Sequence, residues 1–174
     1  MILGMSTATY TLIHVLISLI AIASGFVVMY GLLRGTRLDR MTALFLTTTV
    51  LTSVTGFGFP MGDHLSPANR VGIISLVVLA TAIIARYPLH LAGGWRRTYV
   101  ISAAMALYLN TFVLVVQSFE KVPTLKALAP TQKEPPFAIA QGIVLVAFIV
   151  LTIYAVKRFR SGPVVAVRSS GKAA

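Results

Sequence analysis

The stretch that decides the fold is residues 8–33, ATYTLIHVLISLIAIASGFVVMYGLL, which RGTRLDR follows at residues 34–40. The first part holds no Asp, Glu, Lys or Arg, whereas arginine recurs through the second. About 20 apolar helical residues cross a hydrocarbon core of about 30 Å. We therefore expect a membrane-spanning helix that ends at a positive flank. Met1 to Thr11 holds no Lys or Arg, so we interpret the run as a retained span and not as a cleaved signal peptide.

Further apolar runs of similar length follow, at residues 41–59, 71–87, 98–118 and 136–156. Over the 174 residues, 57% are hydrophobic and 11% are charged, and the mean hydropathy is +0.88. Soluble domains hold about 25% charged residues. The sequence therefore predicts an all-α integral membrane bundle of five transmembrane helices.

The basic residues test this span count, because most of them flank the apolar runs. With five spans, 11 of the 15 Lys and Arg residues share one side. These are Arg34, Arg37, Arg40, Arg86, Arg96, Arg97, Lys157, Arg158, Arg160, Arg168 and Lys172. If residues 41–59 did not cross, the asymmetry would vanish. Since positive residues favour the cytoplasmic side, we expect five spans, with the N-terminus outside and the C-terminus in the cytoplasm.

The chain is expected to form one transmembrane domain, residues 1–160, and a disordered cytoplasmic tail, residues 161–174. Two outer loops are expected, at residues 61–69 and at residues 120–135. The second is the longest and is rich in proline.

Composition also excludes several classes of function. Without Cys the chain holds no disulfide, thiolate metal site or thiol nucleophile. The pI of about 10.8 does not indicate nucleic-acid binding, because the basic residues flank spans and form no basic face with interleaved aromatics. No catalytic motif is present, so we expect a non-enzymatic protein.

Polar side chains within spans mark the candidate site, because they are costly in lipid and face the bundle interior. By depth and helical periodicity, several share the outer side with the loop at residues 61–69. The predicted ligand-binding residues are His14, Asn110, Gln117, Gln141, Asp63 and His64.

Other interpretations of these residues stay open. Asn110, Gln117 and Gln141 are also typical of the hydrogen bonds that join membrane helices. His14 and His64 form the candidate axial pair for a haem b. An Asp63–His64 metal site is disfavoured, because neighbouring side chains point apart in regular structure.

Three stretches carry a resemblance to a known group of proteins. They are TGFGFP (residues 55–60), HLSPANRVGIISL (64–76) and LAPTQ (128–132) with EPPF (134–137). Here the chain resembles a family of small multi-pass proteobacterial inner-membrane proteins without assigned function. The resemblance implies a location in a bacterial inner membrane and transfers no catalytic residue.

The sequence thus predicts an accessory subunit of a larger membrane complex, or a small-ligand binder with an outward-facing polar pocket around His14. One alternative is a b-type haem or quinone redox protein. Another is an oligomeric small-solute carrier or channel. Beyond the lipid bilayer, the possible partners are further copies of the chain or subunits of a membrane complex.

Overall fold

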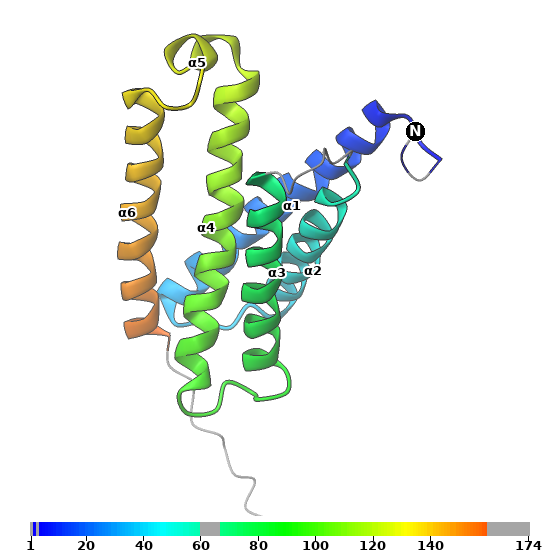
Figure 1. The fold of residues 1–174 in the computed structure, drawn as a ribbon. Coiled ribbons are helices and arrows are strands. Elements are labelled where there is room, and N and C mark those ends of the chain that lie inside the picture. Colours follow the sequence, from blue (N-terminus) through cyan, green and yellow to red (C-terminus); the bar gives the residue numbers. More distant parts are fainter. Residues whose placement is uncertain (1, 3, 60–66, 160–174) are drawn as a thin grey trace, which may run out of the picture.

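A computed structural model describes residues 2, 4–59 and 67–159 of the chain (Figure 1). Helices make up 82% of these residues, and no strand occurs among them, so the all-α prediction is confirmed. The loop expected around Asp63 and His64 and the tail expected at residues 161–174 lie outside the described residues. The helices are α1 (Thr7–Arg34), α2 (Asp39–Gly56), α3 (Pro67–Arg86), α4 (Trp95–Lys121), α5 (Pro123–Leu128) and α6 (Pro135–Arg158).

Helix α1 has a defined cap at each end. The Ser6 hydroxyl accepts a hydrogen bond from the backbone N–H of Thr9 at 3.1 Å. Gly35 follows the last residue in the left-handed region, at φ 72°, and its N–H donates to the carbonyl of Leu32. This geometry costs glycine nothing and turns the chain directly into α2. Helices α1 and α2 consequently lie antiparallel as a hairpin, and they pack against each other more extensively than any other pair.

The bundle has two distinct ends, which we name by their contents. At the basic end Arg86, the last residue of α3, pairs with Asp39, the first residue of α2. At the cavity end the Tyr10 hydroxyl donates to the carbonyl of Thr55 at 2.7 Å, which joins the start of α1 to the end of α2. Helix α2 therefore runs from one end of the bundle to the other.

Within residues 4–59 and 67–159, four helices are long and apolar enough to cross a membrane: α1, α3, α4 and α6. Helix α2 is not among them, because Asp39 and Arg40 begin it and threonines fill it. Its hydroxyls form hydrogen bonds within the helix. Those of Thr48 and Thr49 donate at 2.7 Å to carbonyls one turn earlier, so these polar groups are satisfied within the helix.

The close-packed core lies in the half of the bundle toward the basic end. Small residues of α3 and α4, such as Ala82 and Ala106, let the helices approach closely. Gly25 does the same for α1, since a Cβ there would lie 2.5 Å from Leu107 and 2.8 Å from Phe45. Toward the cavity end α1 diverges from α4 at a steep angle (Figure 1).

Helix α6 packs on α4 and α1 with one face only. Its outer face is apolar and exposed at Ile139, Ile143, Val146, Ile149, Val150 and Ile153. That composition suits contact with lipid chains.

The expectation of a loop over residues 120–135 is wrong in one part, because residues Pro123–Leu128 form a helix. Helix α5 occupies the middle of this segment and lies above the end of α4 (Figure 1). Pro123 is its first residue, where the missing N–H breaks no helical hydrogen bond.

Candidate functional site

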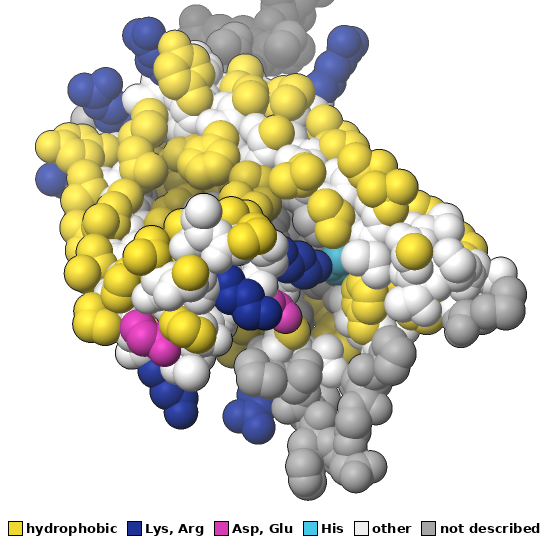
Figure 2. All heavy atoms as spheres, turned by 90° about the horizontal axis from the view of Figure 1, so that it is seen from above, with side chains coloured by type: hydrophobic (Ala, Val, Ile, Leu, Met, Phe, Trp, Pro, Cys, Tyr) yellow, Lys and Arg dark blue, Asp and Glu magenta, His cyan; other side chains and the backbone are white. Residues whose placement is uncertain are grey.

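A cavity of about 640 Å³ opens between α1, α2, α3 and α4 at the cavity end. It arises because α1 leaves α4 beyond Gly25, so the side chains of the four helices no longer meet. Viewed onto this end, Figure 2 shows a hollow among hydrophobic side chains, with basic, acidic and histidine side chains around it. The size is ordinary for a small-molecule site, which spans about 300–1,000 Å³.

His14 lies two turns inside α1 and lines the cavity. Its Nδ1 is 2.8 Å from Oγ1 of Thr55, and the Thr55 hydroxyl donates its own proton to the carbonyl of Leu51 at 2.7 Å. Nδ1 is therefore the protonated nitrogen, which we assign from this network. Phe59 holds the ring edge-to-face, with centroids 5.2 Å apart. In this neutral tautomer Nε2 is an acceptor.

Asn110 forms the polar part of the wall on α4. Its Nδ2 donates to Oγ1 of Thr49 at 3.2 Å, and that hydroxyl in turn donates to the carbonyl of Phe45. The bond ties α4 to α2 below the cavity. The amide consequently has a structural role as well as a place in the cavity wall.

The hydroxyl of Thr52 differs from the neighbouring hydroxyls of α2 in its hydrogen bonding. The hydroxyls of Thr48, Thr49, Ser53 and Thr55 all donate to carbonyls of their own helix. Oγ1 of Thr52 is buried and has no hydrogen-bond partner among the described residues, although the residue lines the cavity. An unsatisfied buried hydroxyl costs about 1–3 kcal/mol, but this oxygen is closed to the cavity, so a ligand reaches it only after the Thr52 side chain rotates.

The mouth of the cavity is charged. Gln117, Glu120 and Lys121 line it from the last turn of α4. Nε2 of Gln117 donates to Glu120 at 3.3 Å. The rest of the wall is mostly apolar, with Val15, Leu19, Ile22, Val71, Leu109, Val113 and Leu114 among its residues. The cavity is therefore polar toward His14 and the mouth and apolar along its sides.

The structure brings together part of the predicted site. His14, Asn110 and Gln117 line one cavity, whereas Gln141 does not. Nε2 of Gln141 donates instead to the carbonyl of Phe112 at 3.2 Å and ties α6 to α4. The sequence analysis placed Gln141 in the wall from depth and periodicity, and neither determines which helices are neighbours.

The haem and metal interpretations gain nothing from the geometry. His64 and Asp63 are outside the described ranges, so the His14–His64 pair stays a prediction. Over residues 4–59 and 67–159, no three His, Asp or Glu side chains lie close enough to hold a metal ion. His90, the other histidine in these ranges, lies at the opposite end of the bundle.

Sequence reasoning missed the polar residues that α2 and α3 contribute. Thr52 and Ser53 line the cavity from α2, and Asn69 and Ser75 line it from α3. A signal for α3 exists, because Asn69, Gly72 and Ser75 recur at three-residue spacing and share one helix face. On α2 the signal is hidden among many threonines.

Comparisons with models of protein families, with curated proteins and with solved structures found no match to this chain. The resemblance to small proteobacterial membrane proteins therefore stays a prediction.

Proposed function

We propose that this chain is a non-enzymatic membrane protein that binds one small amphipathic molecule in the cavity around His14. The observation that carries the proposal is the pairing of an apolar wall with Nε2 of His14, an acceptor that has no hydrogen-bond partner among the described residues. A molecule with a hydroxyl head and an apolar body satisfies both features. Its hydroxyl donates to His14, and its body lies along Leu19 and Leu109.

The cavity favours this function over the accessory-subunit interpretation, because a subunit contact requires no internal space. A bound ligand also compensates for the divergence of α1 from α4. Where two helices diverge they lose dispersion contacts with each other, and a molecule bound between them restores those contacts.

Photo-crosslinking tests the proposal with a diazirine-bearing dodecanol as the probe. In the purified protein we expect saturable labelling of α1 and α4 residues that line the cavity, competed by excess unlabelled dodecanol. The variant Ser18→Phe fills the cavity and should abolish that labelling. Ala147→Phe places the same ring on the exposed face of α6 and should leave it unchanged.

Val113→Phe fills the cavity from α4 and serves as a second blocking variant if Ser18→Phe does not fold. Labelling that never saturates, or that persists in both filled variants, would refute the ligand site.

We further propose that α2 is a fifth span, and that the basic end faces the cytoplasm of a bacterial inner membrane. Its 18 residues reach about 27 Å, close to the thickness of the hydrocarbon core. The contact of Asp39 with Arg86 supports this topology, because it places the start of α2 level with the end of α3.

The cysteine-free chain allows a direct test of the topology with an impermeant maleimide. Five spans predict that Thr36→Cys and Ala92→Cys are labelled from the same side, and Lys133→Cys from the other. A chain in which α2 does not cross would group Thr36→Cys with Lys133→Cys and contradict the proposal.

A further inference from the structure

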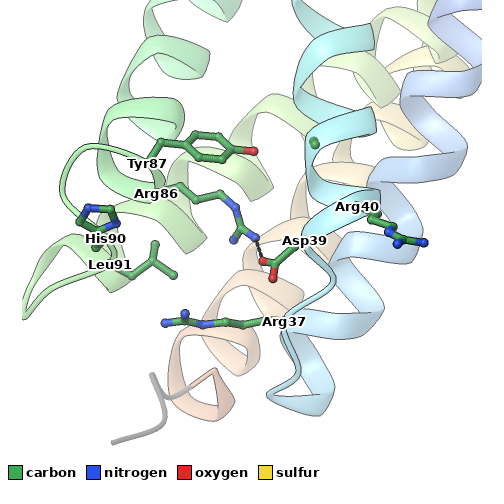
Figure 3. A pocket seen from close by; sticks show the side chains of 8 residues that line it. Arg37, Asp39, Arg40, Arg86, Tyr87, His90 and Leu91 are labelled. Atoms are coloured by element: carbon green, nitrogen blue, oxygen red, sulfur yellow. Dashed lines mark hydrogen bonds and ion pairs between the residues drawn. The ribbon is translucent and has the colours of Figure 1, made fainter. Parts of the chain in front are cut away.

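A second pocket, of about 410 Å³, lies at the basic end, between the start of α2, the end of α3 and the α3–α4 turn. Figure 3 shows Arg37, Arg86 and His90 around a common space, with Tyr87 above it and Leu91 beside it. Arg40 is at the margin, and its guanidinium points away from the others. The proposed ligand of the His14 cavity makes no use of this pocket.

The pocket is positively charged because its arginines outnumber its acids. Asp39 is its one carboxylate, and it pairs with Arg86. Across the part of the chain that the structure describes, no acidic side chain pairs with Arg37 or Arg40. An anion that enters the pocket therefore meets the Arg37 guanidinium, whose charge no carboxylate among the described residues neutralises.

The side chain of Arg86 is held in a fixed position at the pocket, which favours the binding of an anion. Its side chain is 7% exposed, while that of Asp39 is 78% exposed. The guanidinium carbon lies 5.1 Å from the ring centre of Tyr99 and 5.8 Å from that of Tyr87, both within cation–π range. A guanidinium fixed in this way loses little further entropy when it binds a ligand.

The turn after α3 holds His90 at the pocket in a strained backbone. His90 and Leu91 both have positive φ, at 46° and 58°. Such conformations cost non-glycine residues about 1–3 kcal/mol each and persist only where packing fixes them. Leu91 provides that packing, since it is 3% exposed and its N–H donates to the carbonyl of Ala85 at 3.0 Å.

We propose that this pocket binds the phosphate of an anionic phospholipid. Guanidinium groups match phosphate oxygens in two-pronged hydrogen bonds, and His90 adds an imidazole donor. The position fits a lipid headgroup, because the pocket lies where apolar helices end and where Trp95 and Tyr87 are exposed. Basic pockets of this kind between spans take anionic headgroups.

Native mass spectrometry of the purified full-length chain in neutral detergent provides the test. Dioleoylphosphatidylglycerol should bind with one tight site, at least tenfold tighter than dioleoylphosphatidylcholine. Arg37→Gln and His90→Gln should each weaken that site by about tenfold, in line with a lost charge-assisted hydrogen bond. Arg37→Lys keeps the charge without the two-pronged geometry, so its affinity for the lipid should lie between those of the wild type and Arg37→Gln.

Arg97→Gln is the matched control, because Arg97 is an exposed arginine of the same end outside the pocket. It should change the affinity by less than about twofold. Equal losses in Arg97→Gln and Arg37→Gln would show general attraction of charge and overturn the site. Equal binding of the two lipids would also overturn it. Displacement of the lipid by inorganic phosphate at millimolar concentration would reassign the pocket to a free phosphorylated ligand and refute the lipid.

Discussion

The two halves of the bundle use the same helices in opposite ways. Toward the basic end Leu107 is 1% exposed and touches the region of Gly25 and Phe45, with no space left between the helices. Toward the cavity end Leu114, on the same face of α4 two turns further along, borders about 640 Å³ of open volume. The difference teaches that hydrophobic composition does not determine packing here. The packing depends on the point where α1 crosses α4 at Gly25, which we call the glycine crossing. The two helices are close at that level and diverge toward the cavity end.

Leucine truncation in each half gives the largest expected contrast. Leu107→Ala removes a close-packed side chain and should lower the free energy of unfolding by about 2–5 kcal/mol. Leu114→Ala should cost less than about 1 kcal/mol, because that side chain already borders empty volume. Thermal unfolding of both variants in the same detergent measures the difference. Equal costs would mean that the two halves are packed alike.

The glycine crossing itself gives the next effect. Gly25→Val pushes a branched side chain into Leu107 and Phe45, and overpacking of this kind costs about 1–3 kcal/mol. Gly142→Val is the control, since a Cβ at Gly142 meets nothing within 4 Å. Unfolding midpoints should drop for the first variant and stay near wild type for the second. A tolerated Gly25→Val would remove the crossing as the cause of the splay.

A smaller effect is expected from the polar wall of the open half. Asn110→Leu deletes the hydrogen bond to Thr49 but leaves that hydroxyl bonded to its own helix. Hydrogen bonds between membrane helices contribute about 0.6 kcal/mol on average, and we expect a loss of that order. Gln117→Leu, at the exposed mouth, should change stability by less. A loss of several kcal/mol at Asn110 would make it a main support of the bundle.

The smallest effect concerns the turn between α5 and α6. Partial desolvation alone would raise the pKa of Glu134, but hydrogen bonds from Thr131 and Lys133 outweigh it and hold that pKa below its usual range. The ionised Glu134 therefore stabilises this turn. Its stabilising effect is complete above the pKa of a free glutamate, about 4.3, and is lost as the pH falls below that value and the carboxylate is protonated. Glu134→Gln should lack this dependence.

Amide exchange of residues 129–135, compared between about pH 6 and about pH 3, measures the effect. Protection that falls with pH to the same extent in wild type and Glu134→Gln would assign it to another group. The packed half should show no such dependence, because its core cluster holds no carboxylate.

The helices could be predicted from the sequence because the bilayer imposes strong constraints. Long uncharged runs such as residues 8–33 have few alternatives to a helix in lipid, so their existence and order were clear. Boundaries moved by a few residues, and α5 was missed because a six-residue helix leaves no periodic signal.

The candidate site could be predicted only in part. Helical depth and periodicity place His14 at a level that Asn110 and Gln117 bracket on α4, and these three do line the cavity. Periodicity does not determine which helices are neighbours, so Gln141 was included while the residues of α2 and α3 were not. The cavity itself depends on the angle of α1, and no local pattern in the sequence encodes that angle.

The tight turn at Gly35 has a consequence for how the chain enters a membrane. Helix α2 begins with Asp39 and Arg40 and carries many hydroxyls, so it is a poor insertion signal by itself. Gly35 to Leu38 tether it beside α1, which is strongly apolar. In the proposed five-span topology the two helices enter the bilayer as one hairpin, and α1 supplies the driving force for both. This topology predicts that a chain without α1 leaves α2 in the aqueous phase.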